Sequence, residues 1–305
     1  MGFISLANDK PLKQLISFLL IVLFSTVIFT GIGFIITFIS YGTEVLQLIN
    51  DLSNPESVSA MRNILMWSNL GMFPVPVIVF ALLSGRPAMR YMNTSGLPAL
   101  KSIVFAIALY FISGPFIGML TEWNQSLSLP QWLSGLDRWI HQSEENARLT
   151  TEALMNVKDY HSLAMNLLVL ALLPAIGEEL MFRSFFIRFF SGFIKNIHVN
   201  ILLVSILFSA VHLQFLGFLP RFALGMMLGY FFYYSGSVYL PMLIHFTNNA
   251  TVVIIYYLYN TGKIEIHPDK FGNIDNALII ILSGILAVTG FYLFVKTSKK
   301  QAELR

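Results

Sequence analysis

Residues 163–186 read LAMNLLVLALLPAIGEELMFRSFF. The run is long enough to cross a hydrocarbon core of about 30 Å at a rise of about 1.5 Å per residue. It nevertheless contains Glu178, Glu179 and Arg183. An ionised side chain in the middle of a bilayer costs about 2.5–3.5 kcal/mol or more. The stretch therefore predicts a transmembrane helix whose charged residues have a use inside the membrane.

The composition of the whole chain indicates a bilayer environment. Of its 305 residues, 56% are hydrophobic and only 11% are charged, and the mean hydropathy is +0.70. Soluble domains carry about 25% charged residues. The net charge of +3 includes no block of basic residues of the kind that binds nucleic acid. Because the chain has no Cys, disulfides, thiolate nucleophiles and Cys-ligated metals are excluded.

Outward from residues 163–186, the sequence predicts an all-α, polytopic bundle with about eight transmembrane helices. The first apolar run, Leu15–Ile39, exceeds the roughly 7–15 apolar residues of a signal peptide, so we expect it to span the membrane. The other expected spans are Ile64–Leu83, Ser102–Leu120, Leu163–Phe186, Asn200–Leu213, Phe218–Tyr234, Val238–Tyr259 and Ala277–Val295. Gly225 and Gly229 form a G-x-x-x-G pattern that is typical of a helix-packing face.

Basic and acidic residues alternate between successive loops. The basic loops hold Lys10, Lys13, Arg86, Arg90, Lys101, Arg183, Arg188, Lys195, Lys296, Lys299, Lys300 and Arg305, whereas Arg62 and three other basic residues lie in the acid-rich loops. The intervening acid-rich loops hold Glu44, Asp51, Glu56, Glu122, Asp137, Glu144, Glu145, Glu152 and Asp159. Because Lys and Arg concentrate on the cytoplasmic side, we expect both termini to be cytoplasmic. The long loop also carries Trp132 and Trp139, which predict an interfacial helix.

Glu178, Glu179 and Arg183 differ in their partners along the helix. Glu179 and Arg183 are four residues apart, so they share a face and can pair. Glu178 is rotated by about 100° from Glu179 and has no such partner, which leaves it to face a cavity as a general base. The alternative interpretation is a solvated face at the cytoplasmic interface.

Two further helices carry isolated polar residues. His212 follows Phe208 by four residues on the fifth predicted span, roughly 18 Å from Asn200 along the helix. His245 and Asn249 share one face of the seventh span. Each group alone is equally typical of hydrogen bonding between helices, worth about 0.6 kcal/mol. Because all three helices connect to the cytoplasmic side, we expect the three groups to converge at one depth.

The ordered motifs E-E-x-x-x-R, F-x-x-x-H and H-x-x-x-N, at Glu178–Arg183, Phe208–His212 and His245–Asn249, resemble those of the CPBP family of intramembrane peptidases. That family includes type II CAAX prenyl proteases, bacteriocin-processing enzymes and Abi proteins. The resemblance covers about Leu163–Tyr259. It divides the chain into N-terminal helices (1–162), a CPBP-like catalytic core (163–259) and a final helix with a cytoplasmic tail (260–305).

The resemblance implies an endopeptidase that cleaves a membrane-embedded or lipidated substrate with an activated water. Glu178 and His212 would hold the water, and His245 and Asn249 would stabilise the oxyanion. Glu179, Arg183 and Phe208 would support them structurally. The family further implies an integral protein of a membrane such as the bacterial inner (plasma) membrane.

Two questions stay open at the level of sequence. We favour chemistry without a cofactor, but Glu178, His212 and His245 are also a possible zinc set with an open position for water. The second alternative is a non-catalytic membrane scaffold, or a bacteriocin-immunity-type protein, that uses the same bundle to bind a partner.

Overall fold

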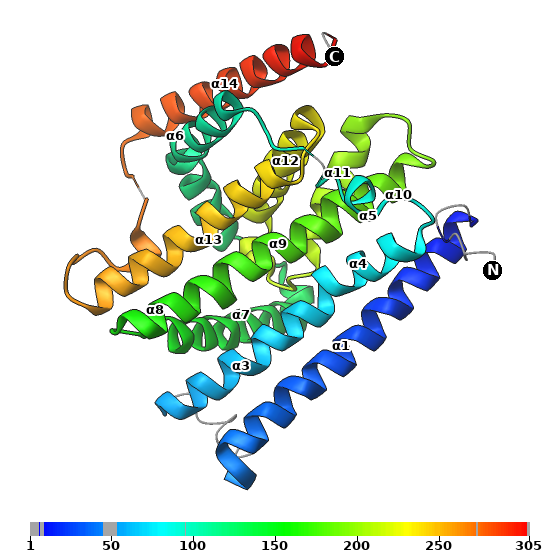
Figure 1. Cartoon of the computed structure of the whole chain (residues 1–305). Helices are drawn as coiled ribbons and strands as arrows, with labels where there is room; N and C mark the ends of the chain where they lie inside the picture. Colours follow the sequence, from blue (N-terminus) through cyan, green and yellow to red (C-terminus); the bar gives the residue numbers. More distant parts are fainter. Residues whose placement is uncertain (1–5, 7–8, 45–53, 95, 273, 304–305) are drawn as a thin grey trace. The chain divides into compact units, whose positions relative to one another are not determined.

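The computed structural model describes residues 6, 9–44, 54–94, 96–272 and 274–303 (Figure 1). These residues form helices and turns, and no strand occurs among them. The predicted all-α polytopic bundle is therefore confirmed. Asp51 of the first acidic loop and Arg305 of the basic tail lie outside the described residues.

Six helices of the described chain, rather than the expected eight, are long and apolar enough to cross a membrane. They are Pro11–Tyr41, Pro55–Leu83, Leu100–Gln125, Tyr160–Ser191, Phe215–Ser235 and Ala277–Thr297. The two others expected do not qualify. The helix α11, Ile197–Ala210, has only 14 residues. The helix α13, Tyr239–Asn260, has 22 residues, but polar residues such as His245, Asn248 and Asn249 lower its hydropathy.

The chain divides into two compact units that interleave along the sequence. The first comprises Met1–Ser95, Thr150–Phe193 and His245–Glu265, and the second comprises Gly96–Leu149, Ile194–Ile244 and Ile266–Arg305. The division into residues 1–162, 163–259 and 260–305 stays a prediction from the sequence.

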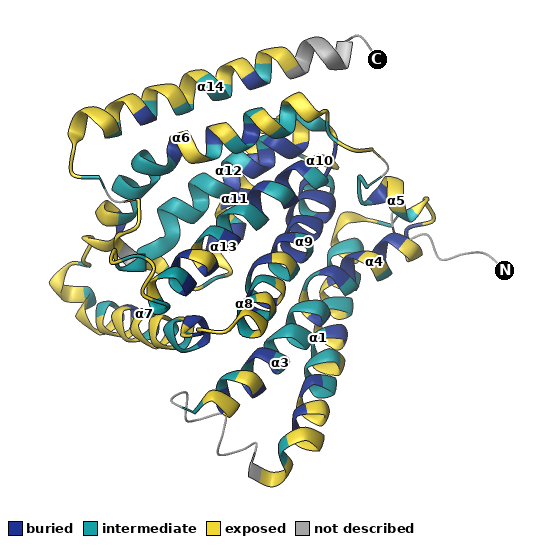
Figure 2. Ribbon diagram, turned by 60° about the vertical axis from the view of Figure 1, so that its left-hand side comes forward, coloured by how far each residue is buried: buried dark blue, intermediate teal, exposed yellow. Residues whose placement is uncertain are grey.

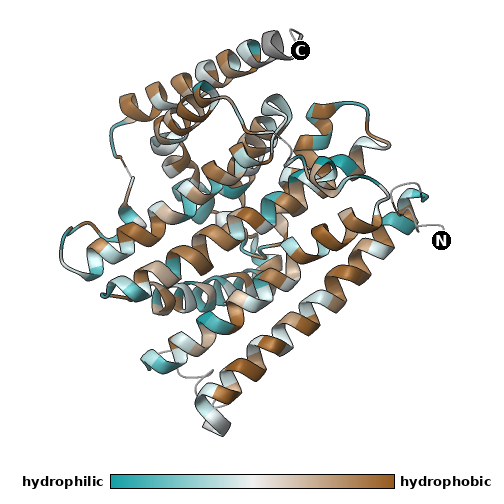
Figure 3. Cartoon of the chain, viewed as in Figure 1, coloured by the Kyte–Doolittle hydropathy of each residue, from teal (hydrophilic) through white to brown (hydrophobic). Residues whose placement is uncertain are grey.

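In the first unit, α1 (Pro11–Tyr41) packs along α3 (Pro55–Met72) and α4 (Pro74–Leu83) (Figure 1). The Ser25 hydroxyl of α1 donates to the carbonyl of Gly71 at 2.6 Å. Pro55 begins α3 behind the cap residue Asn54, and Pro74 begins α4, because proline is tolerated in the first helical turn. Much of α1 is apolar and exposed, as a helix facing lipid should be (Figures 2 and 3).

The acidic stretch lies in the most buried span of the first unit, residues 160–191. This span consists of α8 (Tyr160–Asn166), α9 (Leu173–Glu179) and α10 (Arg188–Ser191), joined by π-helical turns at Leu167–Leu172 and Leu180–Ile187. Its start is capped by Asp159, whose carboxylate accepts from the Ser162 amide at 2.8 Å. That hydrogen bond lowers the pKa of Asp159. The span thus continues through both wide turns with the two glutamates between them.

The end of this span is tied to the segment that follows α4, which includes α5 (Ala88–Tyr91). The Ser184 hydroxyl donates to the carbonyl of Met92 at 2.6 Å, and a guanidinium N–H of Arg188 donates to that of Tyr91 at 2.7 Å. These bonds fix the residues that follow the acidic stretch within the first unit.

The second unit contains α6 (Leu100–Gln125), most of α7 (Ser134–Met155), α11, α12 (Phe218–Ser235) and α14 (Ala277–Glu303). Its core is formed by Ala106, Leu109, Leu228, Phe231, Leu240, Ile244 and Phe294. A Cβ at Gly225 would lie 3.2 Å from Phe208, and one at Gly229 would lie 2.7 Å from Ile201. The predicted G-x-x-x-G packing face is therefore present, with α12 antiparallel to α11.

Candidate active site

Four charged or titratable residues of the predicted site lie together in the interior of the first unit. The exposed fractions are 0% for Glu179, 1% for Arg183, 4% for His245 and 7% for Glu178. A solvated acidic face does not describe these side chains. Buried charges persist in proteins when they are paired and hydrogen-bonded, so their partners decide what each one can do.

Glu179 contacts a basic side chain with each of its oxygens. Its Oε2 lies 2.9 Å from Nε of Arg183, which is the ion pair expected from the spacing of four residues. Its Oε1 lies 2.9 Å from Nδ1 of His245 on α13. Glu179 therefore joins the acidic helix to α13 and holds the His245 ring in place.

The bond to Glu179 determines the orientation of the His245 ring. An ionised carboxylate can only accept hydrogen bonds, so Nδ1 of His245 carries a proton. Nε2 then faces Glu178, with 3.9 Å between Nε2 and Oε2. This separation is too long for a direct hydrogen bond, and a water beside the two atoms can bridge them. A single small group can thus contact both side chains.

Asn249 lies one turn beyond His245 on α13 and is half-buried. The Nδ2 of Asn248 donates to its Oδ1 at 3.0 Å. With the amide oxygen engaged, the Nδ2 of Asn249 is the group left to donate, and it has no acceptor among the described residues. Asn248 was not among the predicted site residues, although its position beside Asn249 in the third motif was a signal.

His212 and Phe208 belong to the second unit. The helix α11 ends at Ala210, so the predicted span to Leu213 was too long, and the backbone turns through Leu213 at a φ of +54°. The backbone carbonyl of Phe208 accepts from Nδ1 of His212 at 2.8 Å. Since a carbonyl cannot donate, Nε2 of neutral His212 is the nitrogen that can accept a proton. Convergence of His212 with Glu178 stays a prediction.

Glu178 and His245 also carry donor atoms of the kind that bind metal ions. Among the described residues, no group of three His, Asp or Glu side chains is placed to hold a metal ion. Two features nevertheless suit one: Glu178 and His245 face each other, and a carboxylate behind the His245 ring is the usual support of a metal-binding histidine. Because the third predicted ligand, His212, belongs to the second unit, the zinc set stays a prediction.

The six apolar helices of the described chain define an integral, multi-pass membrane protein, and the acidic cluster lies in a segment that is similar to a known family. Residues 160–251 match the family model described as type II CAAX prenyl endopeptidase Rce1-like. The matched segment contains all three motifs and ends two residues beyond Asn249. The resemblance to the CPBP family predicted from those motifs is thereby confirmed over this segment. Neither a curated protein nor a solved structure matches the chain.

Proposed function

We propose that this protein hydrolyses a peptide bond of a membrane-embedded or lipidated substrate, using a water molecule held by Glu178 and His212. The observation that carries the proposal is the placement of Nε2 of His245 opposite Glu178, fixed from behind by Glu179. The Glu179–Arg183 pair alone could serve stability. Burying the adjacent Glu178 carboxylate as well costs free energy, which favours a chemical role for Glu178.

In the proposed reaction, Glu178 acts as the general base. It removes a proton from the water as the water oxygen attacks the carbonyl carbon of the scissile bond. The carbonyl oxygen becomes an oxyanion. When the carbon–nitrogen bond breaks, the proton passes from Glu178 to the leaving amine, which restores the carboxylate. His212 would accept a hydrogen bond from the same water through Nε2, because its Nδ1 is engaged by Phe208.

His245 and Asn249 are the proposed oxyanion donors. Because Nδ1 of His245 donates to Glu179, the ring would donate to the oxyanion through Nε2 as the doubly protonated imidazolium. Each fixed donor of this kind contributes about 2.7–4 kcal/mol to stabilisation of the transition state. The orientation of Asn249 by Asn248, with its Nδ2 left to donate, supports this role. Glu179, Arg183 and Phe208 would position the reacting groups rather than touch the substrate.

Zinc is the alternative source of the nucleophile. If it is used, Glu178, His212 and His245 would hold it, and it would make the attacking water more acidic, so that the water is a nucleophile at neutral pH. We propose the metal-free route, in which activity survives exhaustive chelation. Loss of activity on chelation, with recovery on adding zinc, would assign the metal route and leave the peptidase function in place.

The direct experiment compares membranes that contain wild-type protein, Glu178→Gln or Glu56→Gln. Glu56 is an exposed carboxylate of the same unit and serves as the control for the charge change. Mass spectrometry of membrane peptides should detect cleavage products with wild type and Glu56→Gln and none with Glu178→Gln. Identical peptides from all three would overturn the proposal and favour the non-catalytic scaffold.

A further inference from the structure

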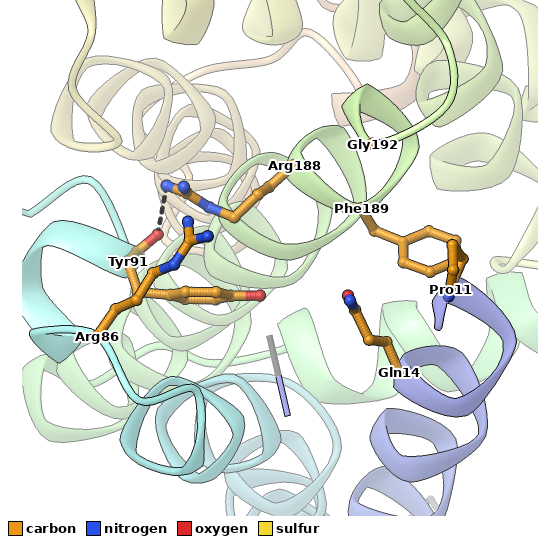
Figure 4. A pocket seen from close by; sticks show the side chains of 7 residues that line it. All are labelled: Pro11, Gln14, Arg86, Tyr91, Arg188, Phe189 and Gly192. Atoms are coloured by element: carbon orange, nitrogen blue, oxygen red, sulfur yellow. Dashed lines mark hydrogen bonds between the residues drawn. The ribbon is translucent and has the colours of Figure 1, made fainter. Parts of the chain in front are cut away.

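A pocket of about 190 Å³ lies in the first unit, apart from the acidic cluster (Figure 4). It is formed by the start of α1, the segment after α4 and the end of α10. Its polar lining consists of Gln14, Arg86, Tyr91 and Arg188, and its apolar lining includes Pro11 and Phe189. The peptidase mechanism uses none of these residues.

Two guanidinium groups meet in this pocket without a carboxylate. Arg86 and Arg188 lie on the same side of it, near Tyr91 (Figure 4). No acidic residue is among the lining residues that the structure describes. Asp9, which precedes α1, is paired with Lys13 at 3.0 Å. Two like charges placed together repel each other, so an anion between them would be stabilised.

Arg188 is held in position by neutral groups only. One terminal guanidinium nitrogen donates two hydrogen bonds. One goes to the backbone carbonyl of Tyr91 at 2.7 Å, and the other goes to Oδ1 of Asn93 at 2.6 Å. Its guanidinium carbon lies 4.8 Å from the centre of the Tyr91 ring. Its Nε is buried and has no hydrogen-bond partner in the described part of the chain. The positive charge is therefore fixed in place but not neutralised.

Two other features of the pocket suit an anion. Burial raises the pKa of Tyr91 to about 12, against the opposing effect of Arg188 and Arg86, so its phenol stays neutral and can donate. The hydroxyl points toward Gln14 across the pocket (Figure 4). The first turn of α1, with Pro11 at its start, adds the partial positive charge of a helix N-terminus.

The pocket lies where three apolar spans end, at residues 11, 83 and 191. This is the level at which lipid headgroups meet a membrane protein. Arg86 is exposed, and Phe189 and Pro11 offer apolar surface beside the charges. From this combination we infer that the pocket binds the phosphate group of an anionic phospholipid, in the leaflet on which the basic loops lie.

The test measures binding of short-chain phosphatidylglycerol to the full-length protein in neutral detergent, through the lipid-dependent rise of the melting temperature. Arg86→Gln is the decisive variant, because Arg86 is exposed and its loss should not impair folding. Arg90→Gln makes the same charge change at an exposed neighbour that does not line the pocket. The measurement requires no turnover, so its outcome is independent of the proposed peptidase activity.

We expect saturable stabilisation by phosphatidylglycerol in wild type and Arg90→Gln. In Arg86→Gln the apparent Kd should rise by at least about tenfold, as loss of a charge-assisted hydrogen bond implies. Equal affinity in Arg86→Gln and Arg90→Gln would overturn the inference. It would also be overturned if inorganic phosphate stabilised the protein as well as the lipid at equal concentration. A response to a peptide with a free C-terminal carboxylate, but not to the lipid, would assign the pocket to peptide instead.

Discussion

Glu179 has a fully buried side chain, and both of its oxygens are engaged, one by Arg183 and one by His245. The adjacent Glu178 faces Nε2 of the same imidazole. Two neighbouring residues of identical chemistry thus have different environments, because each points to a different side of its helix. The arrangement supports Glu179 as a positioning residue and Glu178 as the reacting one.

Arg183→Ala should destabilise the protein strongly, because it leaves the Glu179 carboxylate buried without its cation. Removal of one partner from a buried ion pair costs about 3–5 kcal/mol. The comparison is with Arg90→Ala, an exposed position at which changes usually stay within about 0.5 kcal/mol. Thermal melts in detergent measure the difference. Equal melting temperatures for the two variants would show that the Arg183–Glu179 pair does not stabilise the fold.

Asn249→Ala should lower kcat by about 10²–10³ with a much smaller change in KM, because an oxyanion donor acts mainly in the transition state. Asn248→Ala should give a smaller loss of kcat, since Asn248 only orients the Asn249 amide. Steady-state kinetics on one peptide substrate test both variants. A rise in KM at unchanged kcat for Asn249→Ala would instead mean that Asn249 binds the ground state.

At the scale of elements, the acidic helix approaches the junction of α3 and α4 at Gly177. A Cβ at this position would lie 2.6 Å from Cβ of Phe73 and 2.8 Å from Cδ of Pro74. Such contacts cannot be relieved without moving a helix, because the neighbouring atoms lie close to the backbone. Gly177 is therefore what allows the two glutamates to lie at this depth in the unit.

Gly177→Ala should lower the free energy of unfolding by about 1–3 kcal/mol, the usual cost of overpacking. Gly31→Ala is the matched control, because Gly31 also lies within a helix of the first unit and a Cβ there has nothing within 4 Å. It should be neutral or stabilising by up to about 1 kcal/mol. In the same detergent, Gly177→Ala should melt below wild type, whereas Gly31→Ala should melt at or above the wild-type temperature. Equal shifts would contradict the close approach.

The lengths of the apolar runs in the sequence predicted six of the spans, because a helix needs about 20 continuous apolar residues to cross a bilayer. It misjudged α11 and α13, where helix length and polar content differ from those of a span. The π-helical turns have no residue pattern of their own. One of them, Leu167–Leu172, directly precedes the turn containing Pro174, which has no N–H to donate to Leu170.

The site was predictable only where its partners are close in sequence. The Glu179–Arg183 pair follows from helical spacing, and so does the shared face of His245 and Asn249. The bond between Glu179 and His245 joins residues 66 positions apart. Helical periodicity indicates the face of a helix on which a residue lies, but it does not identify the helix packed against that face. The contact between Glu179 and His245 is therefore seen only in the tertiary structure.

At the scale of the whole molecule, the arrangement of the first unit supports the predicted topology. The pocket brings Pro11, Arg86 and Arg188 to the same end, as expected if the start of α1 and the ends of α4 and α10 face one compartment. Six spans, the count in the described part of the chain, and eight spans are both even numbers, so the lower count leaves the prediction of two cytoplasmic termini unchanged.

Reporter fusions at Lys13 and after Arg305 should both give cytoplasmic signals, because the basic loops determine the orientation. A fusion in the acidic loop, at Glu145, provides the opposite control and should report the other compartment. An external signal from either terminus would overturn the topology and, with it, the leaflet assigned to the lipid pocket.

The central proposal is that Glu178 and His212 act on one water. A double-mutant cycle of Glu178→Gln and His212→Ala, measured as kcat/KM on one peptide, tests it most directly. If the two groups act together, each single variant should lose nearly all activity and the double variant should lose little more than either. Strictly multiplicative losses would contradict the shared-water mechanism.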